Sequence, residues 1–196
     1  MAIDAKMVAQ LRELTGAGMM DAKNALLETD GNLEKAAEEL RKKGAAKAAK
    51  KSERVTGEGR VHAYLHSNNK LGAMVEVLCE TDFVARNEAF IAMCHDLAMH
   101  VSAADPLYLS RADVPAEVVE KEKTRHQESD DLKGKPAEVL EKIIEGKLNK
   151  WYSEVVLLEQ PFIKDEDLTV EDYLKSKIAS LGENMKINRF ARFHIA

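Results

Sequence analysis

The chain has 196 residues, 45% hydrophobic and 32% charged, which suits a globular protein of one or two domains with its own core. Aromatic residues make up only 5%, so aliphatic side chains, alanine and methionine must fill most of that core. A formal net charge of −5 argues against general nucleic-acid binding, and no stretch approaches the roughly eighteen apolar residues of a membrane span.

Residues 1–43 are typical of a small module of three helices. The spacing of apolar residues predicts each of the three helices. Val8, Leu11 and Leu14 mark one face of the first helix, whereas Met19, Met20, Ala22, Ala25 and Leu26 suit a short second helix and Leu33, Ala36, Ala37 and Leu40 a third. Gly16 and Gly18 break the first helix from the second, and Asn32 suits the N-cap of the third. With so few large residues, we expect the module to have a marginal core.

Residues 44–56 are predicted to form a basic linker. The stretch from Arg41 to Arg60 holds eight Lys or Arg and two Glu, a local charge of +6. Such a basic, alanine-rich stretch indicates a solvated, partly helical connector. The alternative is a nucleic-acid contact, but the stretch has no interleaved aromatic residues and lies in an acidic protein, so we expect no direct nucleic-acid binding.

Residues 57–196 are predicted to form an α+β core that begins with a hairpin. The alternating apolar residues all fall on odd positions: Val61, Ala63 and Leu65 in the first strand, then Leu71, Ala73, Val75, Val77 and Cys79 in the second. A three-residue loop, 67–69, would pair residue 66 with residue 70. Odd positions would then oppose odd positions, and the two buried faces would agree.

Helices and a final strand complete the predicted core. Asn87 suits the cap of a helix whose apolar stripe is Phe90, Ile91, Cys94, Leu97, Ala98 and Val101. Pro115 and Pro136 open further helices, and another lies between Thr169 and Gly182. Met185–Ile195 is expected to be a strand with a bulge between Ile187 and Phe190. The fold class is therefore α+β: a three-helix module, a basic linker, and an antiparallel sheet of at least three strands with packed helices.

The search for chemistry gives no catalytic constellation. No glycine-rich nucleotide loop occurs, so we expect no cofactor. His62 and His66 share one strand face and could be metal ligands, but exposed strand histidines are the better interpretation, and no metal is expected. Cys94 and His95 are adjacent on a helix and point about 100° apart, which disfavours a nucleophile–base pair. Cys79 and Cys94 are expected to be buried free thiols.

The connection after the second strand is unusual. Cys79–Asn87 carries Phe83 and Val84 at turn positions, beside Thr81 and Asp82, where small or polar residues are usual. An aromatic residue on a tight loop can be a wedge that fits a pocket on a partner. The alternative is that Phe83 tucks under its own loop, since large apolar residues are mostly buried.

Five strings, in order along nearly the whole chain, resemble the elongation factor Ts family. They are Thr15–Asp21 with the following Lys23 and Ala25-Leu26, Gly44–Lys51, Cys79–Asn87, Leu157–Phe162 and Gly182–Asn184. Members of this family exchange nucleotide on elongation factor Tu, the GTPase that carries aminoacyl-tRNA to the ribosome. The resemblance implies an exchange factor without covalent chemistry, not an enzyme in the usual sense.

The resemblance also implies two contact regions. The N-terminal module would be a ubiquitin-associated-like domain that docks on the nucleotide-binding domain of elongation factor Tu through Arg12, Met19, Met20 and Lys23. Adjacent methionines suit an adaptable apolar surface, although packing within the module is the alternative for them.

The loop of Thr81, Asp82, Phe83 and Val84 would be the second region. Its Phe83 would insert between helices of elongation factor Tu near the Mg²⁺ site and release GDP. Asp82 would position the loop through a hydrogen bond to its backbone or to elongation factor Tu.

The chain also departs from longer family members, which carry a second core subdomain, a coiled-coil hairpin and a C-terminal module. Short members are expected to dimerise, and Met185–Ile195 is a candidate interface, an internal sheet strand being an equal interpretation.

Because the first residues have no basic region followed by an apolar run, we expect a cytoplasmic protein. The alternatives are a ubiquitin-associated-like adaptor without exchange activity and an RNA-binding accessory factor, whose binding should weaken steeply with salt.

Overall fold

The computed structural model describes residues 3–128 and 136–195. The N-terminal helices are α1 (Ala5–Thr15), α2 (Met19–Glu28) and α3 (Leu33–Ala49). Asn32 caps α3 as predicted, because its side chain accepts a 3.0 Å hydrogen bond from the backbone N–H of Lys35. The three helices enclose a small cluster of buried residues: Val8, Leu11, Ala22, Ala25, Leu26, Ala36, Ala37 and Leu40. On the predicted apolar face of α1, Val8 and Leu11 are buried, whereas Leu14 is exposed.

Helix α3 continues into the predicted linker. Ala48 is buried in the main core, and a Cβ added at Gly44 would lie 3.6 Å from the Cβ of Ala179 in α8 (Val170–Leu181). The predicted partly helical character is therefore confirmed for residues 44–49, but the prediction of a solvated connector is wrong at Gly44 and Ala48, which are buried. Five of these six residues are Ala or Lys, which favour helix, and their small side chains allow close packing. The division of the chain at residues 43 and 56 stays a prediction.

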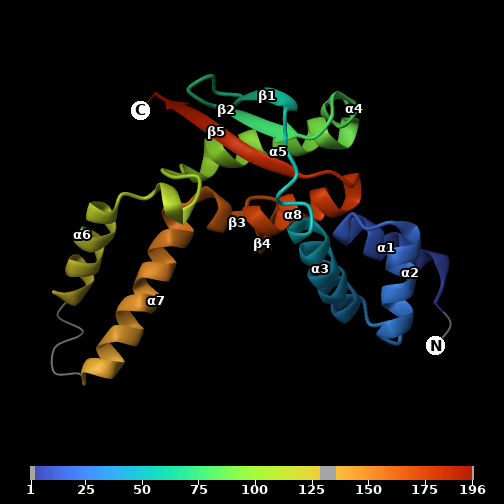
Figure 1. Cartoon of the computed structure of the whole chain (residues 1–196), viewed down its shortest axis with the longest axis horizontal. Coiled ribbons are helices and arrows are strands. Elements are labelled where there is room, and N and C mark those ends of the chain that lie inside the picture. The colour runs from blue at the N-terminus through green and yellow to red at the C-terminus, as the bar shows by residue number, and fades with distance from the viewer. Residues whose placement is uncertain (1–2, 129–135, 196) are drawn as a thin grey trace.

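A three-stranded antiparallel sheet lies across the top of the molecule in the view of Figure 1. Its strands, in spatial order, are β1 (Glu58–Leu65), β2 (Leu71–Cys79) and β5 (Met185–His194). Helix α5 (Glu88–Ala104) packs along one face, and Asn87 caps it through the backbone N–H of Ala89. The predicted bulge is confirmed, because Val77 pairs with Ile187 and Glu76 with Arg189, which leaves Asn188 without an opposite residue.

The hairpin register differs from the prediction by one residue. Leu65 pairs with Gly72, so the loop spans four residues, 67–70, with Asn69 in the left-handed region at φ 57°. A one-residue slip moves every side chain of a strand to the other face. The even positions His62 and Tyr64 therefore face α5, whereas Val61 and Leu65, predicted to be buried, are exposed. The predicted buried face of β2 is correct.

The changed register also buries part of the His62 side chain. It is half-buried, and its Nε2 lies 3.3 Å from Nδ1 of His95 on α5, so the prediction of an exposed strand histidine is wrong for His62. Burial and the neighbouring His95 lower the pKa of His62 below its usual range. The prediction is correct for His66, which is exposed.

Below α5 lies α8, which begins and ends as predicted. The Thr169 side chain accepts from the backbone N–H of Asp172, and Gly182 ends the helix in the left-handed conformation. A short hairpin that the sequence did not predict precedes α8, with strands β3 (Pro161–Phe162) and β4 (Asp165–Thr169).

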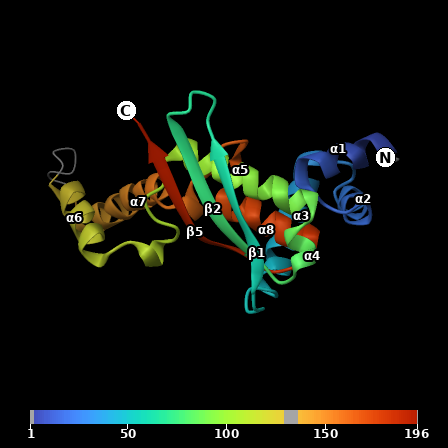
Figure 2. The same cartoon turned by 90° about the horizontal axis from the view of Figure 1, so that it is seen from above.

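A pair of helices extends from the core at the end opposite α1 and α2 (Figures 1 and 2). They are α6 (Ala116–Gln127) and α7 (Ala137–Val155), flanked by the 3₁₀ helices η1 (Arg111–Asp113) and η3 (Leu157–Glu159). At their base, Arg111 pairs with Glu159 and lies 4.2 Å from the ring centroid of Tyr152. The helices predicted to open at Pro115 and Pro136 are therefore confirmed, and they pack against each other. No described helix is long and apolar enough to cross a membrane.

Candidate partner-binding site

The turn between β2 and α5 is a short helix, α4 (Asp82–Ala85), capped by Thr81. The Thr81 carbonyl accepts from the backbone N–H of Ala85 at 3.2 Å and from the Cys79 thiol at 3.2 Å. Burial raises the pKa of Cys79 to about 11, so the thiol keeps the proton that it donates. The backbone at the start of this turn is thus fixed from the strand side.

Phe83 projects from this turn into solvent. Its side chain is 82% exposed, while Val84 is half-buried against the main core and Ala85 is buried. Phe83 therefore does not tuck under its own loop. A large aromatic side chain held open on a fixed turn is apolar area that a partner can bury.

Asp82 makes its visible contact within the same turn. Its Oδ2 lies 3.0 Å from Nη2 of Arg86, and both side chains are substantially exposed. Exposed ion pairs of this kind contribute little to stability, about 0–1 kcal/mol. Of the two roles expected for Asp82, the described contact is with a side chain of the turn and leaves the carboxylate accessible to a partner.

Glu183 is the residue of this site that sequence reasoning missed. It follows α8, and its carboxylate accepts hydrogen bonds from the backbone N–H groups of Glu80 and Thr81 and from the Thr81 hydroxyl, at 3.1, 3.0 and 2.6 Å. The string Gly182–Asn184 was a signal for this segment, but it carried no role. More than one hundred residues separate the two sides of the contact.

The second expected contact region is the outer side of α2. Met19 and Met20 are 61% and 64% exposed, and Lys23 is also exposed, so the two methionines do not pack within the module. Arg12, on α1, donates from Nε to the Ala17 carbonyl at 3.3 Å, next to the start of α2. Both views place α4 at the same end of the molecule as α1 and α2 (Figures 1 and 2).

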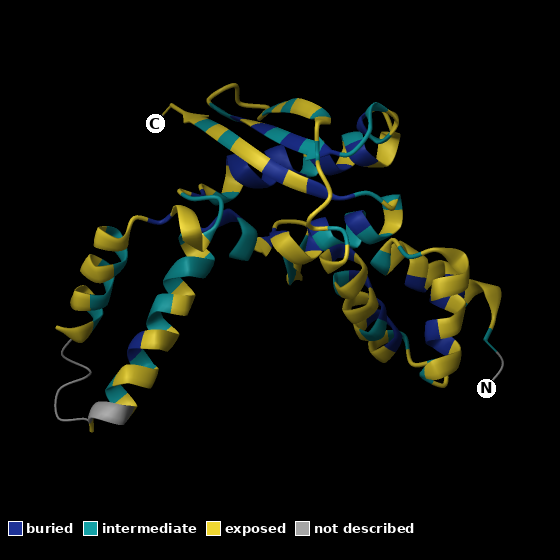
Figure 3. Cartoon of the chain, in the orientation of Figure 1, coloured by how far each residue is buried: buried dark blue, intermediate teal, exposed yellow. Residues whose placement is uncertain are grey.

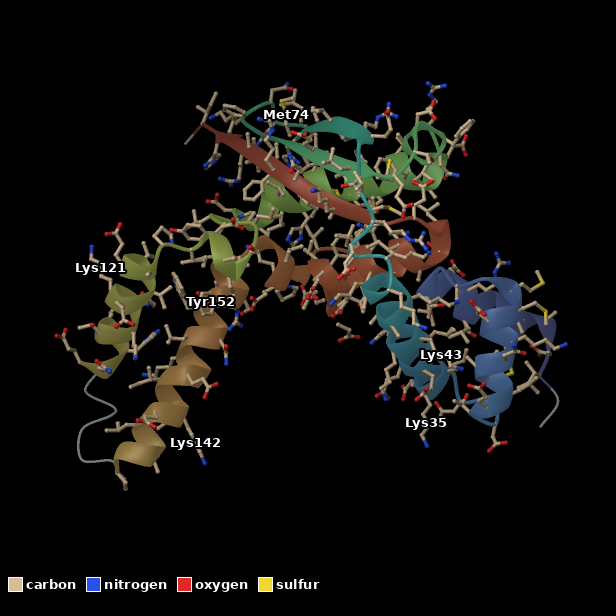
Figure 4. All side chains as sticks on the ribbon, viewed as in Figure 1. Lys35, Lys43, Met74, Lys121, Lys142 and Tyr152 are labelled. Carbon is tan, nitrogen blue, oxygen red and sulfur yellow. The ribbon has the colours of Figure 1, made fainter. Side chains whose placement is uncertain are left out.

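A third apolar surface covers the face of the sheet turned away from α5, here called the outer sheet face. Its exposed large residues are Val61, Leu65, Met74 and Phe193, with Ile195 just beyond β5. Figure 3 shows exposed residues alternating with more buried ones along the strands, and Figure 4 shows Met74 pointing away from the helices. The strand Met185–Ile195 contributes to this face while it also pairs with β2.

Other chemistry finds little support in residues 3–128 and 136–195. No group of three or more His, Cys, Asp or Glu there could hold a metal ion. Cys94 is buried, and burial raises its pKa to about 12, so the thiol is not activated as a nucleophile. The prediction that both cysteines are buried and free is confirmed.

Comparison with known proteins points to one family. The family model described as elongation factor TS matches residues 5–196. The chain is 57% identical to elongation factor Ts of Maridesulfovibrio salexigens, over all of this chain and 95% of that protein. It is 54% identical to that of Thermosipho melanesiensis (98% of each chain) and 53% identical to that of Geobacter sulfurreducens (98% of this chain and 89% of that protein).

Proposed function

The chain belongs to the elongation factor Ts family, a family of translation elongation factors, and on that premise we propose that it promotes GDP release from elongation factor Tu in the cytoplasm. The observation that carries the proposal is Phe83, an exposed aromatic residue on a turn whose backbone is fixed from both sides. The protein acts by exchange, without covalent chemistry.

The mechanism works on the contacts that retain GDP. Elongation factor Tu, as a GTPase, binds its nucleotide largely through the phosphates and Mg²⁺, which neutralises phosphate charge. Insertion of Phe83, with Thr81, Asp82 and Val84 beside it, displaces the elements that hold Mg²⁺ and phosphate. Burying one Phe side chain supplies about 1.5–3 kcal/mol, so the rest must come from further contact area.

The N-terminal module supplies that further contact. Arg12, Met19, Met20 and Lys23 form the docking surface, and methionine side chains adapt to a partner of irregular shape. Since α2 and α4 lie at the same end of the molecule, one partner can touch both (Figure 1).

Binding of the two ligands to elongation factor Tu is reciprocal. If this chain weakens nucleotide binding by a given factor, nucleotide weakens the binding of this chain by the same factor. GTP entry therefore releases the exchange factor, and no cofactor is consumed.

The test is GDP release followed by stopped flow, with elongation factor Tu loaded with a fluorescent GDP. We expect strong acceleration by the wild type and a much smaller one by Phe83→Ala and Asp82→Ala. Leu107→Ala, which removes an exposed apolar side chain near the base of α7, is the matched control and should act as the wild type does. If Phe83→Ala accelerates GDP release as strongly as the wild type does, the insertion of Phe83 is not the mechanism, although the exchange function stands. Binding without acceleration would favour the adaptor alternative.

We also propose that two copies of the chain associate through the outer sheet face. Monomeric proteins rarely expose a continuous apolar area of this kind, and here it spans all three strands. Phe193→Arg would place a charge in that interface, whereas Leu107→Arg places one elsewhere. Analytical ultracentrifugation should show a dimer for the wild type and Leu107→Arg and a monomer for Phe193→Arg; a monomeric wild type would contradict the proposal.

A further inference from the structure

We propose that Glu183 is a positioning residue for nucleotide exchange: from the turn after α8, its carboxylate fixes the backbone that presents Phe83, and so sets the maximal rate of GDP release. This inference rests on the proposed function. Glu183 acts through the backbone of Glu80 and Thr81, to which its carboxylate is hydrogen-bonded.

The topology brings the two segments together. Cys79, the last residue of β2, pairs with Met185, the first residue of β5. The chain therefore leaves the sheet on one strand and enters it on the neighbouring strand at the same level, so that 80–81 runs beside 183–184. Gly182, at φ 83°, makes the turn that points Glu183 toward Thr81.

One carboxylate satisfies three donors on the loop. Both oxygens are used: Oε2 accepts two successive backbone N–H groups, and Oε1 accepts the Thr81 hydroxyl. Hydrogen bonds to a charged acceptor are shorter and roughly twice as strong as neutral ones, and the 2.6 Å contact has the expected length. Thr81 is also the N-cap of α4, so fixing Thr81 fixes the start of the helical turn that carries Phe83.

The segments 80–81 and 183–184 are hydrogen-bonded to each other in both directions. The Glu80 carboxylate accepts from the backbone N–H of Asn184 at 2.5 Å, while the Asn184 amide donates to the carbonyls of Ser52 and Arg54. Arg54 Nη1 lies 3.5 Å from Glu80 Oε1 and supplies a positive charge beside it. Each segment thus binds the backbone of the other, and the end of the linker is attached to the same point.

The positioning can be measured first without any partner. In the free protein, Glu183→Ala should speed amide hydrogen exchange at Glu80 and Thr81 by about tenfold or more, while the amide of Val77 in β2 stays protected. Glu183→Gln should lie between, because its one carbonyl oxygen still accepts. Unchanged protection of Glu80 and Thr81 in Glu183→Ala would overturn the proposal.

The kinetic test separates positioning from binding. GDP release from elongation factor Tu is followed over a range of exchange-factor concentrations. For Glu183→Ala we expect the maximal release rate to fall about tenfold or more, since small misplacements of a working group are costly. The half-saturating concentration should change less than about threefold, because the module surface is intact, and Glu183→Gln should restore part of the rate.

Glu159→Ala is the matched control for a structural effect. Glu159 is also a half-buried carboxylate that binds two donors, those of Arg111, but it lies at the base of α7. The maximal rate of GDP release with Glu159→Ala should equal that with the wild type. If the wild type accelerates release and Glu183→Ala reaches the same maximal rate, the positioning role is overturned while the proposed function stands. If the wild type gives no acceleration, the proposed function fails first.

Discussion

The two surfaces proposed to contact elongation factor Tu are built in opposite ways. The turn that carries Phe83 lies between β2 and α5 and is fixed by hydrogen bonds to Glu183, more than one hundred residues away. The methionines of α2 lie on a module in which four of the eight described cluster residues are alanine. A fixed turn suits the element that we propose displaces Mg²⁺, and a small module with exposed methionines suits the proposed docking.

The amino-acid composition allows the unfolding of the N-terminal module and of the α+β core to be followed by different signals. Residues 1–49 contain no aromatic residue and no histidine, so aromatic signals and histidine titration report on the rest of the chain. The single tryptophan, Trp151, is in α7.

Leu26→Ala should have the largest effect, and only on the module. Leu26 is fully buried in the small cluster, so the module should lose about 2–5 kcal/mol. In a thermal melt, the far-UV helix signal should begin to fall before the near-UV aromatic signal. Leu27→Ala, at the exposed neighbouring position, should cost less than about 0.5 kcal/mol. Coincident loss of both signals in Leu26→Ala would show that the module has no separate stability.

Gly59→Ala should destabilise the α+β core at β1, the strand that pairs with β2 next to the turn. Gly59 has φ +153°, and an added Cβ would lie 2.3 Å from the Val77 carbonyl oxygen, so we expect a loss of about 2 kcal/mol or more. Urea unfolding followed by Trp151 fluorescence measures it. The control is Gly57→Ala, where an added Cβ meets no atom within 4 Å. Equal stability of the two variants would contradict the close approach of β1 and β2.

Acid should weaken the core and spare the module. His100 is buried, its Nδ1 accepts from the backbone N–H of Ile163 and its Nε2 faces Gln160 Oε1, so the ring is neutral. Burial lowers the pKa of His100, partly opposed by the bond to Gln160, and the pKa of His62 is lowered too. The unfolded chain then takes up protons first as the pH falls.

Core stability should therefore be complete above the ordinary histidine pKa of about 6.5 and fall below it, by at most about 1.4 kcal/mol per pH unit for each proton. Urea unfolding of Trp151 at pH 7.5 and 5.5 measures the change, and His100→Gln should make it smaller. Equal midpoints at the two pH values in the wild type would contradict a neutral buried ring.

The smallest effect on stability is expected for Met20→Ala. Because Met20 is largely exposed, the change should be under about 0.5 kcal/mol in any melt. The substitution should instead weaken the proposed docking on elongation factor Tu. The exchange-factor concentration that gives half-maximal GDP release should rise several-fold, while the maximal rate stays unchanged. A lowered maximal rate with unchanged half-saturation would mean that the module takes part in displacement itself.

The sequence predicted most of the elements because their signals are local. The caps Asn32, Asn87 and Thr169 and the bulge at Asn188 could be read from residue type and spacing. The α+β class followed from the alternation of two periods along the chain.

The errors and omissions are long-range or depend on loop length. Val61 and Leu65 were assigned to the wrong face because a four-residue loop, with Asn69 in the left-handed region, replaced the expected three-residue one. The linker was predicted to begin at Gly44, yet α3 runs through this residue and packs on α8. Glu183 could not be paired with Thr81 because nothing local connects the two.

The most direct test of this contrast is a pair of double-mutant cycles on the maximal rate of GDP release. The first combines Phe83→Ala with Glu183→Ala, and the second combines Met20→Ala with Glu183→Ala. If Glu183 acts by positioning Phe83, the first double variant should be little slower than the slower single variant, with a coupling energy above about 0.5 kcal/mol, whereas the effects in the second should add. Additive losses in the first cycle would contradict the account.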